Sequence, residues 1–216
     1  MNSRGEHMEK VKIQIEVMGG GSIPTYANYN DAGADVYSAE NIIIRPMEKL
    51  VIPLNFKVAL PEHVEMQVRP RSGLSLKTSL SIPNSPGTVD AGFRNVVGVI
   101  VENTYAIANL PYEMLYDDEL RDKVQKDYHI LKADSPKEVF TSYHDKDNST
   151  AEVLNFFPFL VVDKMNNPYG TLYIEKGTKI AQVVFNEVIH AEFVQTEDIE
   201  SIGTNRGGGF GSTGLK

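Results

Sequence analysis

The sequence contains no cysteine, which excludes disulfide bonds, zinc sites built on thiolates and a cysteine nucleophile. No apolar run approaches the roughly 18 residues that span a bilayer, and residues 1–12 lack the apolar segment of a secretory signal. No two histidines stand four apart, as the zinc ligands of one helix would (His7, His63, His129, His144 and His190). We therefore expect a soluble, cytoplasmic protein with no membrane partner.

Positive charge is also scarce, and the 216 residues carry a formal net charge of −8. This balance argues against a protein that binds duplex nucleic acid through a broad surface, although a few well-placed arginines can still hold a small anion. The chain is 41% hydrophobic and 23% charged, a composition that supports a packed core. Its length fits one domain, or one domain that carries an insert.

Most of the chain has the pattern of short β-strands. Apolar and polar residues alternate over residues 11–17 and 64–69, which is typical of strands with one buried face. The runs over residues 96–101 and 180–185 are apolar on both faces and predict strands that are covered on both sides. Together with the glycine and proline turns, these runs predict an all-β fold, a distorted jelly-roll sandwich or barrel.

One stretch departs from this pattern. Residues 111–152 hold eleven acidic and six basic residues, and the spacing of apolar residues over 117–131 predicts an amphipathic helix. The strand pattern resumes over 156–162. We therefore predict a discontinuous β domain over 8–102 and 156–204, with a small, partly helical surface insert over 103–155. The insert is either a solvated surface insertion or a docking element for a protein partner.

Both ends of the chain are expected to lie outside this domain. Residues 205–216 hold five of the seventeen glycines and predict a flexible C-terminal arm. Residues 1–7 precede Met8, and we expect them to be a leader outside the fold.

Residues 70–74 follow a predicted strand and combine a guanidinium, a hydroxyl and a glycine N–H. Arg71, Ser72 and Gly73 thus have the composition of a phosphate-binding loop, although a plain turn at the end of a strand would look similar.

A second motif, residues 84–94, contains the turn residues of a tight hairpin. Asp90 lies near its end between Val89 and Ala91, where partial desolvation would suit a general base. A hydrogen-bonded turn or the cap of a strand would account for the same aspartate.

The third motif is the glycine-rich tail, residues 206–214. It is not a Walker loop, because no Lys-Ser/Thr pair follows the glycines at the required spacing. It is either a linker or an arm that closes over a phosphorylated aromatic ligand, since Arg206 and Phe210 gain little in a plain linker.

The chain resembles the homotrimeric dUTPases (dUTP diphosphatases) in five short motifs that occur in the order of that family. These motifs occupy residues 32–39, 70–74, 84–94, 177–182 and 206–214. The resemblance covers roughly residues 10–102 and 156–216. Because residues 111–152 have no counterpart in the compact members, the chain is similar to a member with an extra acidic insert.

The resemblance implies a jelly-roll subunit and a homotrimer whose active sites are shared between chains. It implies hydrolysis of dUTP to dUMP and pyrophosphate with Mg²⁺ on the triphosphate. Asp90 would be the general base for water that attacks the α-phosphorus, and Asp35 would support the Mg²⁺ shell through water.

The remaining site residues also follow from the resemblance. Five residues would contact uracil and deoxyribose: Asn84, Gly87, Val89, Phe93 and Phe210. Eight would bind the phosphates: Arg71, Ser72, Gly73, Gln182, Arg206, Gly211, Ser212 and Thr213. Phe93 stands where the family usually has tyrosine, and a hydrogen bond lost with that hydroxyl would cost about 0.5–1.5 kcal/mol.

Two other functions remain open at this point. A dCTP deaminase of the same superfamily would need a glutamate placed against C4 of the pyrimidine, and it does not account for the glycine-rich arm. A nucleotide-gated regulatory protein would bind a macromolecular partner through the insert, and this role is compatible with catalysis.

Overall fold

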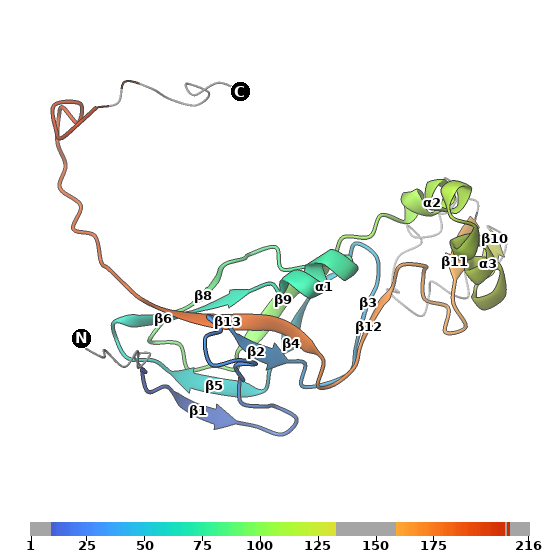
Figure 1. Cartoon of the computed structure of the whole chain (residues 1–216), viewed down its shortest axis with the longest axis horizontal. Helices are drawn as coiled ribbons and strands as arrows, with labels where there is room; N and C mark the ends of the chain where they lie inside the picture. Colours follow the sequence, from blue (N-terminus) through green and yellow to red (C-terminus); the bar gives the residue numbers. More distant parts are fainter. Residues whose placement is uncertain (1–9, 133–158, 206, 208–216) are drawn as a thin grey trace, which may run out of the picture.

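The structure, a computed structural model, describes residues 10–132, 159–205 and 207. Short strands dominate it, with a few short helices (Figure 1). The elements in chain order are β1 (Gln14–Val17), β2 (Ala34–Tyr37), β3 (Ile42–Ile44), β4 (Lys49–Pro53), β5 (Phe56–Ala59), β6 (Val64–Arg69), α1 (Ser72–Lys77), β7 (Leu80–Ser81), β8 (Gly87–Val89), β9 (Gly98–Asn103), η1 (Ile107–Asn109), α2 (Leu110–Tyr116), α3 (Asp118–Asp127), β10 (His129–Lys132), β11 (Phe159–Val162), β12 (Leu172–Ile174) and β13 (Lys179–Glu187).

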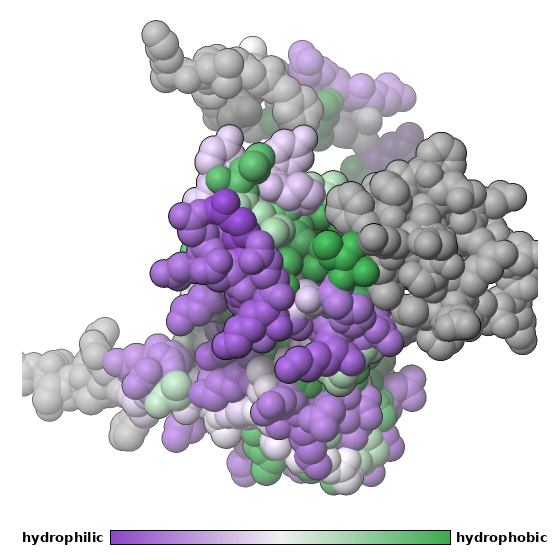
Figure 2. Space-filling model, turned by 90° about the vertical axis from the view of Figure 1, so that its right-hand side faces the viewer, coloured by the Kyte–Doolittle hydropathy of each residue, from purple (hydrophilic) through white to green (hydrophobic). Residues whose placement is uncertain are grey.

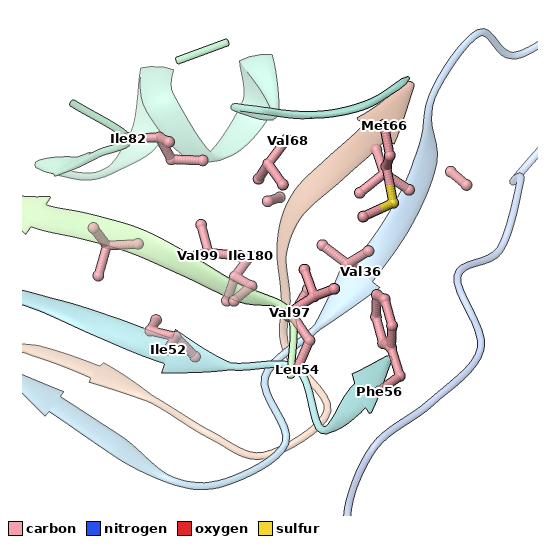
Figure 3. Close-up of a cluster of buried hydrophobic side chains, with 14 of the residues drawn as sticks. Val36, Ile52, Leu54, Phe56, Met66, Val68, Ile82, Val97, Val99 and Ile180 are labelled. Carbon is pink, nitrogen blue, oxygen red and sulfur yellow. The ribbon is translucent and has the colours of Figure 1, made fainter. Parts of the chain in front are cut away.

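Two antiparallel sheets enclose the core. One has the strand order β2-β13-β6-β8 and the other β4-β9-β7, with the pairs β1–β5 and β3–β12 beside them. Val36, Met66 and Ile180 from the first sheet belong to the same buried cluster as Ile52 and Val99 from the second (Figure 3). The predicted all-β class is thus confirmed.

The strand predictions hold where one face of the strand is buried. In β6, Val64, Met66 and Val68 are buried while the residues between them are half-buried. In β9, by contrast, Ile100 is 38% exposed between buried Val99 and Val101. The prediction that the run over 96–101 is covered on both faces is therefore wrong for the single chain.

β13 is the central strand of the larger sheet because it pairs with β2 on one side and with β6 on the other. Along β2, Gln182 pairs with Asp35, whereas Lys179 pairs with Tyr37 after a shift of register between Lys179 and Ala181. Ile180 is therefore an extra residue in the strand, and such a bulge changes the face on which the preceding side chain lies.

The helices and strands of the insert region lie together at one end of the molecule, away from the two sheets (Figure 1). They are α2, α3, β10 and β11. The helix predicted over 117–131 is shorter: α3 begins after Asp117, whose side chain accepts a 2.9 Å hydrogen bond from Leu120 N. It ends before Tyr128, which is extended and packs its ring 5.1 Å from that of Tyr169. The chain then forms β10.

The strand predicted over 156–162 is present as β11, but it pairs with β10 and not with a strand of the two sheets. The sheet pairing resumes at β12, which lies against β3. Residues 133–158 lie outside the described residues, and the predicted domain boundaries remain predictions. Seen from the end of the molecule that carries α2 and α3, the surface has hydrophobic residues among hydrophilic ones (Figure 2).

After β13 the chain leaves the sheet as an extended segment (Figure 1). Its apolar side chains are exposed, with Ile189 and Phe193 both at 94% and Val194 at 79%. Within the described part of the chain, no helix has both the length and the apolar character that a membrane crossing demands.

Candidate active site

The loop that follows β6 carries Arg71, Ser72 and Gly73, as predicted. Ser72 and Gly73 are exposed and form the start of α1. A Cβ added at Gly73 would meet no atom within 4 Å, so packing inside the described chain does not require glycine there. Unhindered backbone at this point suits the close approach of a ligand.

Within this loop, the Arg71 side chain is held by Asp35. Its Oδ1 accepts from Arg71 Nε at 2.7 Å, and its Oδ2 accepts from Lys179 Nζ at 2.8 Å. Asp35 itself is only 8% exposed. Its hydrogen bond and negative charge raise the pKa of the Lys179 ammonium above its ordinary value. Lys179 was not among the predicted site residues, although it lies within the fourth family motif.

Gln182 connects three of the family motifs. Its Nε2 donates to Pro70 O at 2.8 Å, which fixes the start of the loop of residues 70–74. Its side chain also occupies the space in which a Cβ of Gly33 would lie, with Gln182 Cδ 2.9 Å from that position. The amide thus supports the loop of residues 70–74, and its contact with phosphate stays a prediction.

A pocket of about 170 Å³ lies against the hairpin that carries β8. Four of the residues predicted for uracil and deoxyribose line it: Asn84, Gly87, Val89 and Phe93. The Asn84 amide lies across Gly87, where a Cβ would be 2.9 Å from Asn84 Nδ2.

Five further residues line the pocket and were not predicted: Val68, Thr88, Val97, Gly98 and Ile100. Three of them belong to the apolar run over 96–101, which was interpreted as a covered strand. The glycine within that run was the available signal for a position where something approaches the backbone closely.

Asp90 follows β8 and is exposed, so this chain alone does not give the desolvation that was expected. Its backbone oxygen accepts from Phe93 N at 3.0 Å in the turn. Because Val89 pairs with Met66 in antiparallel register, Asp90 lies beside the first half of β6. Arg71 lies beyond the other end of β6, so Asp90 and Arg71 lie toward opposite ends of this strand.

The residues predicted on the C-terminal arm, namely Arg206, Phe210, Gly211, Ser212 and Thr213, lie outside the described residues. The described part of the chain contains no group of three or more His, Cys, Asp or Glu placed to hold a metal ion. Each oxygen of Asp35 has a second lone pair, which fits a contact through water.

A family model, curated relatives and solved structures all match this chain to the same family. The dUTPase family model matches residues 20–107 and 160–214, on both sides of the insert. A deoxyuridine 5'-triphosphate nucleotidohydrolase of Wolbachia pipientis is 38% identical over 117 residues, which cover 52% of this chain and 74% of the relative. That of Clostridium tetani is 43% identical over 98 residues, or 45% and 66% of the two chains.

Solved structures agree with the sequence comparison. A variant of the dUTPase of Staphylococcus bacteriophage 80alpha with dUpNHpp matches with a TM-score of 0.63 and 25% identity, over 95% of this chain and 100% of that chain. A second variant of the same phage enzyme matches with the same TM-score and 26% identity. The fold is that of a dUTPase. Because the dUTPase family model matches most of the chain, the chain belongs to the dUTPase family, the dUTP diphosphatases.

Proposed function

We propose that this chain hydrolyses dUTP to dUMP and pyrophosphate, with Asp90 as the general base. The observation that carries the proposal is the pairing of a pocket lined by Asn84, Gly87 and Phe93 with a cationic loop at Arg71. These are the two halves of a nucleotide site, and both are formed by residues of the family motifs.

The pocket half accounts for the base. The Asn84 amide and the backbone of β8 offer both donors and acceptors to one edge of uracil, and cytosine would leave some of them unpaired. Close approach of the hairpin backbone to C5 of uracil would exclude the methyl group of thymine. Phe93 lies under deoxyribose and leaves no room for a 2′-hydroxyl.

The loop half accounts for the triphosphate. Arg71, Ser72, Gly73 and Gln182 bind the phosphates, and the arm residues Arg206, Gly211, Ser212 and Thr213 close over them while Phe210 stacks on uracil. Mg²⁺, when bound, offsets negative charge on the phosphates. Asp35 supports its hydration shell through water.

In the chemical step, a water oxygen attacks the α-phosphorus while its proton passes to the Asp90 carboxylate. The bond from the α-phosphorus to the bridging oxygen breaks, and pyrophosphate leaves with the electron pair. Positioning of the water in line with this bond and stabilisation of charge carry the catalysis, without a covalent protein intermediate.

The site is assembled from copies of the chain in a homotrimer. The positions of Asp90 and Arg71 toward opposite ends of β6 support this, because a site shared between chains can bring the two residues to one triphosphate. Exposed apolar pairs on the outer faces of the sheets, Val51 with Ile100 and Ile43 with Tyr173, also favour association of copies.

The proposal is tested by incubating the protein with dUTP and, separately, with dCTP, each with Mg²⁺ or with a chelator. We expect pyrophosphate from dUTP alone and only with Mg²⁺. Ammonia from dCTP would assign the chain to the deaminases instead. Binding of dUTP without any product would favour the regulatory function.

The role of Asp90 has its own variant. Asp90→Asn should lower kcat at least a hundredfold, at the lower end of what a general base contributes, while dUpNHpp still binds. Asp122→Asn on α3, which is also an exposed aspartate, is the matched control and should retain full turnover. Full activity in Asp90→Asn would remove Asp90 from the mechanism.

A second, regulatory function is proposed for the insert. α2 exposes Tyr112 (69%), Leu115 (69%) and Tyr116 (90%), and such side chains are typical of protein interfaces. The phage enzyme with 26% identity is described as one of the phage dUTPases that control transfer of virulence genes by a G protein-like mechanism. Partner binding that is lost with the insert, while hydrolysis continues, would support this function.

A further inference from the structure

Lys179 reaches the phosphate site because of the bulge in β13. Asp35 and Tyr37 are two residues apart on β2, so their side chains lie on one face of the sheet. Gln182 pairs with Asp35 and Lys179 pairs with Tyr37, which places both β13 side chains on that same face. In a strand without a bulge, residues three apart would lie on opposite faces, and Lys179 would point toward the core.

The burial of neighbouring residues agrees with this register. Ile180 and Ala181 are adjacent in the sequence, yet they are 1% and 0% exposed. A regular strand would bury only one of them on the core side. The bulge thus keeps Ile180 in the core while Lys179 turns to Asp35.

On that face, Lys179 and Arg71 both form ion pairs with Asp35. Each carboxylate oxygen accepts from a different cation, and Arg71 Nη1 also donates to the backbone oxygen of Lys179 at 3.3 Å. Within the described part of the chain, these contacts engage two of the five N–H groups of the guanidinium. The group of three side chains retains one net positive charge.

We propose that Lys179 is a positioning residue for triphosphate binding, which acts by neutralising Asp35 so that Arg71 remains available to phosphate. Without Lys179, the Asp35 carboxylate would draw Arg71 into a bidentate pair, the preferred geometry of that contact. The site would then hold a neutral pair and would attract the triphosphate less. This inference rests on the proposed function and deepens it.

The test compares Lys179→Met with the unmodified chain. We expect KM for dUTP and the dissociation constant of dUpNHpp to rise about tenfold, as when one charge-assisted hydrogen bond is weakened. kcat should change less than twofold, because an interaction made equally in the ground state and the transition state changes KM alone. Lys179→Arg should restore KM. Lys176→Met removes an exposed lysine from the preceding turn and should behave like the unmodified chain.

Deoxyuridine, which has no phosphates, separates positioning from a structural defect. Its inhibition constant should be the same for Lys179→Met and the unmodified chain, whereas a distorted fold would weaken its binding as well. Unchanged KM and dUpNHpp affinity in Lys179→Met would overturn the inference, as would an equal loss of deoxyuridine binding.

The dUpNHpp measurement also separates this inference from the proposed function. If the unmodified chain formed no pyrophosphate from dUTP, the proposed function would fail. The dependence of dUpNHpp binding on Lys179 would still decide the inference.

Discussion

The side chain of Gln182 occupies the position in which a Cβ of Gly33 would lie, and its amide donates to Pro70 O at 2.8 Å. Gly33 is therefore glycine because of a residue almost 150 positions later in the chain. This contact joins the first, second and fourth motifs of the family at the end of the site where we propose that phosphate binds.

Gly33→Ala should displace the Gln182 amide from Pro70. Because the displaced atoms are the end of a flexible side chain, the melting temperature should change little. KM for dUTP should rise about threefold to tenfold, which corresponds to one lost hydrogen bond. Steady-state kinetics and a thermal melt measure both effects. Gly19→Ala, where an added Cβ meets no atom within 4 Å, is the control, and a KM equal to that of the control would contradict the prediction.

Gly87→Ala should instead damage the pocket in which we propose that uracil binds. The new methyl group would lie 2.9 Å from Asn84 Nδ2 and 3.7 Å from Val68 Cβ, so the Asn84 amide must move. We expect the affinities for dUTP and for deoxyuridine to fall by the same factor, about tenfold or more, because both ligands carry uracil. Competition assays measure the two factors. Loss of dUTP binding alone would mean that Asn84 does not contact the base.

Asn103→Ala should destabilise the fold. Asn103 is fully buried, and its Nδ2 donates to Ile44 O and Gly170 O while its Oδ1 accepts from Ser79 Oγ and Tyr105 N. Truncation leaves several buried polar groups unpaired, at about 1–3 kcal/mol each. The free energy of unfolding in urea should therefore fall by about 3 kcal/mol or more.

The control for this variant is Asn109→Ala. Asn109 is exposed, and although it directly precedes α2, its side chain makes no cap hydrogen bond to that helix. Protein concentration must be held constant between variants, since association of copies also contributes to stability. Equal midpoints for the two variants would contradict the prediction.

Tyr173 should ionise late. Partial burial of the side chain and the hydrogen bond to Asp163 raise its pKa from the ordinary 10.0 to about 12. The folded chain thus holds this proton more tightly than the unfolded chain, so the stability it contributes is complete below pH 10 and is lost as the pH rises toward 12. Absorbance of the phenolate during a pH titration should show one late-ionising tyrosine fewer in Tyr173→Phe. An unchanged titration curve would contradict the assignment.

Replacement of residues 108–159 by a short glycine-serine linker should leave hydrolysis intact. The family model is interrupted across this segment, and the pocket and the loop of residues 70–74 lie outside it. We expect kcat/KM for dUTP within a factor of about three, or about 0.7 kcal/mol, in the standard pyrophosphate assay. Collapse of hydrolysis in a folded variant would place the insert within the catalytic unit.

Much of the fold and the site was predictable from local patterns. The alternation along β6 identified its buried face, because successive side chains of a strand point to opposite sides. The motif residues Arg71, Asn84 and Asp90 were recognisable because they lie in short motifs of glycine, turn residues and charged residues, and these motifs occur in the same order as in the dUTPase family. The paired strand β11 was also found, but not its partner β10, since pairing joins residues that are distant in the sequence.

Only the tertiary structure decided how these residues combine. The bulge at Ile180 determines that Lys179 faces Asp35, and a bulge depends on the register with β2 and not on the sequence of β13 alone. The sheet order places Asp90 and Arg71 at opposite ends of β6, which no spacing in the chain indicates. The sequence by itself determined many of the groups that could bind a nucleotide and most of the strands, because both follow from local residue patterns. The pairing of those strands decided which groups stand together, because register is settled by packing across the whole sheet.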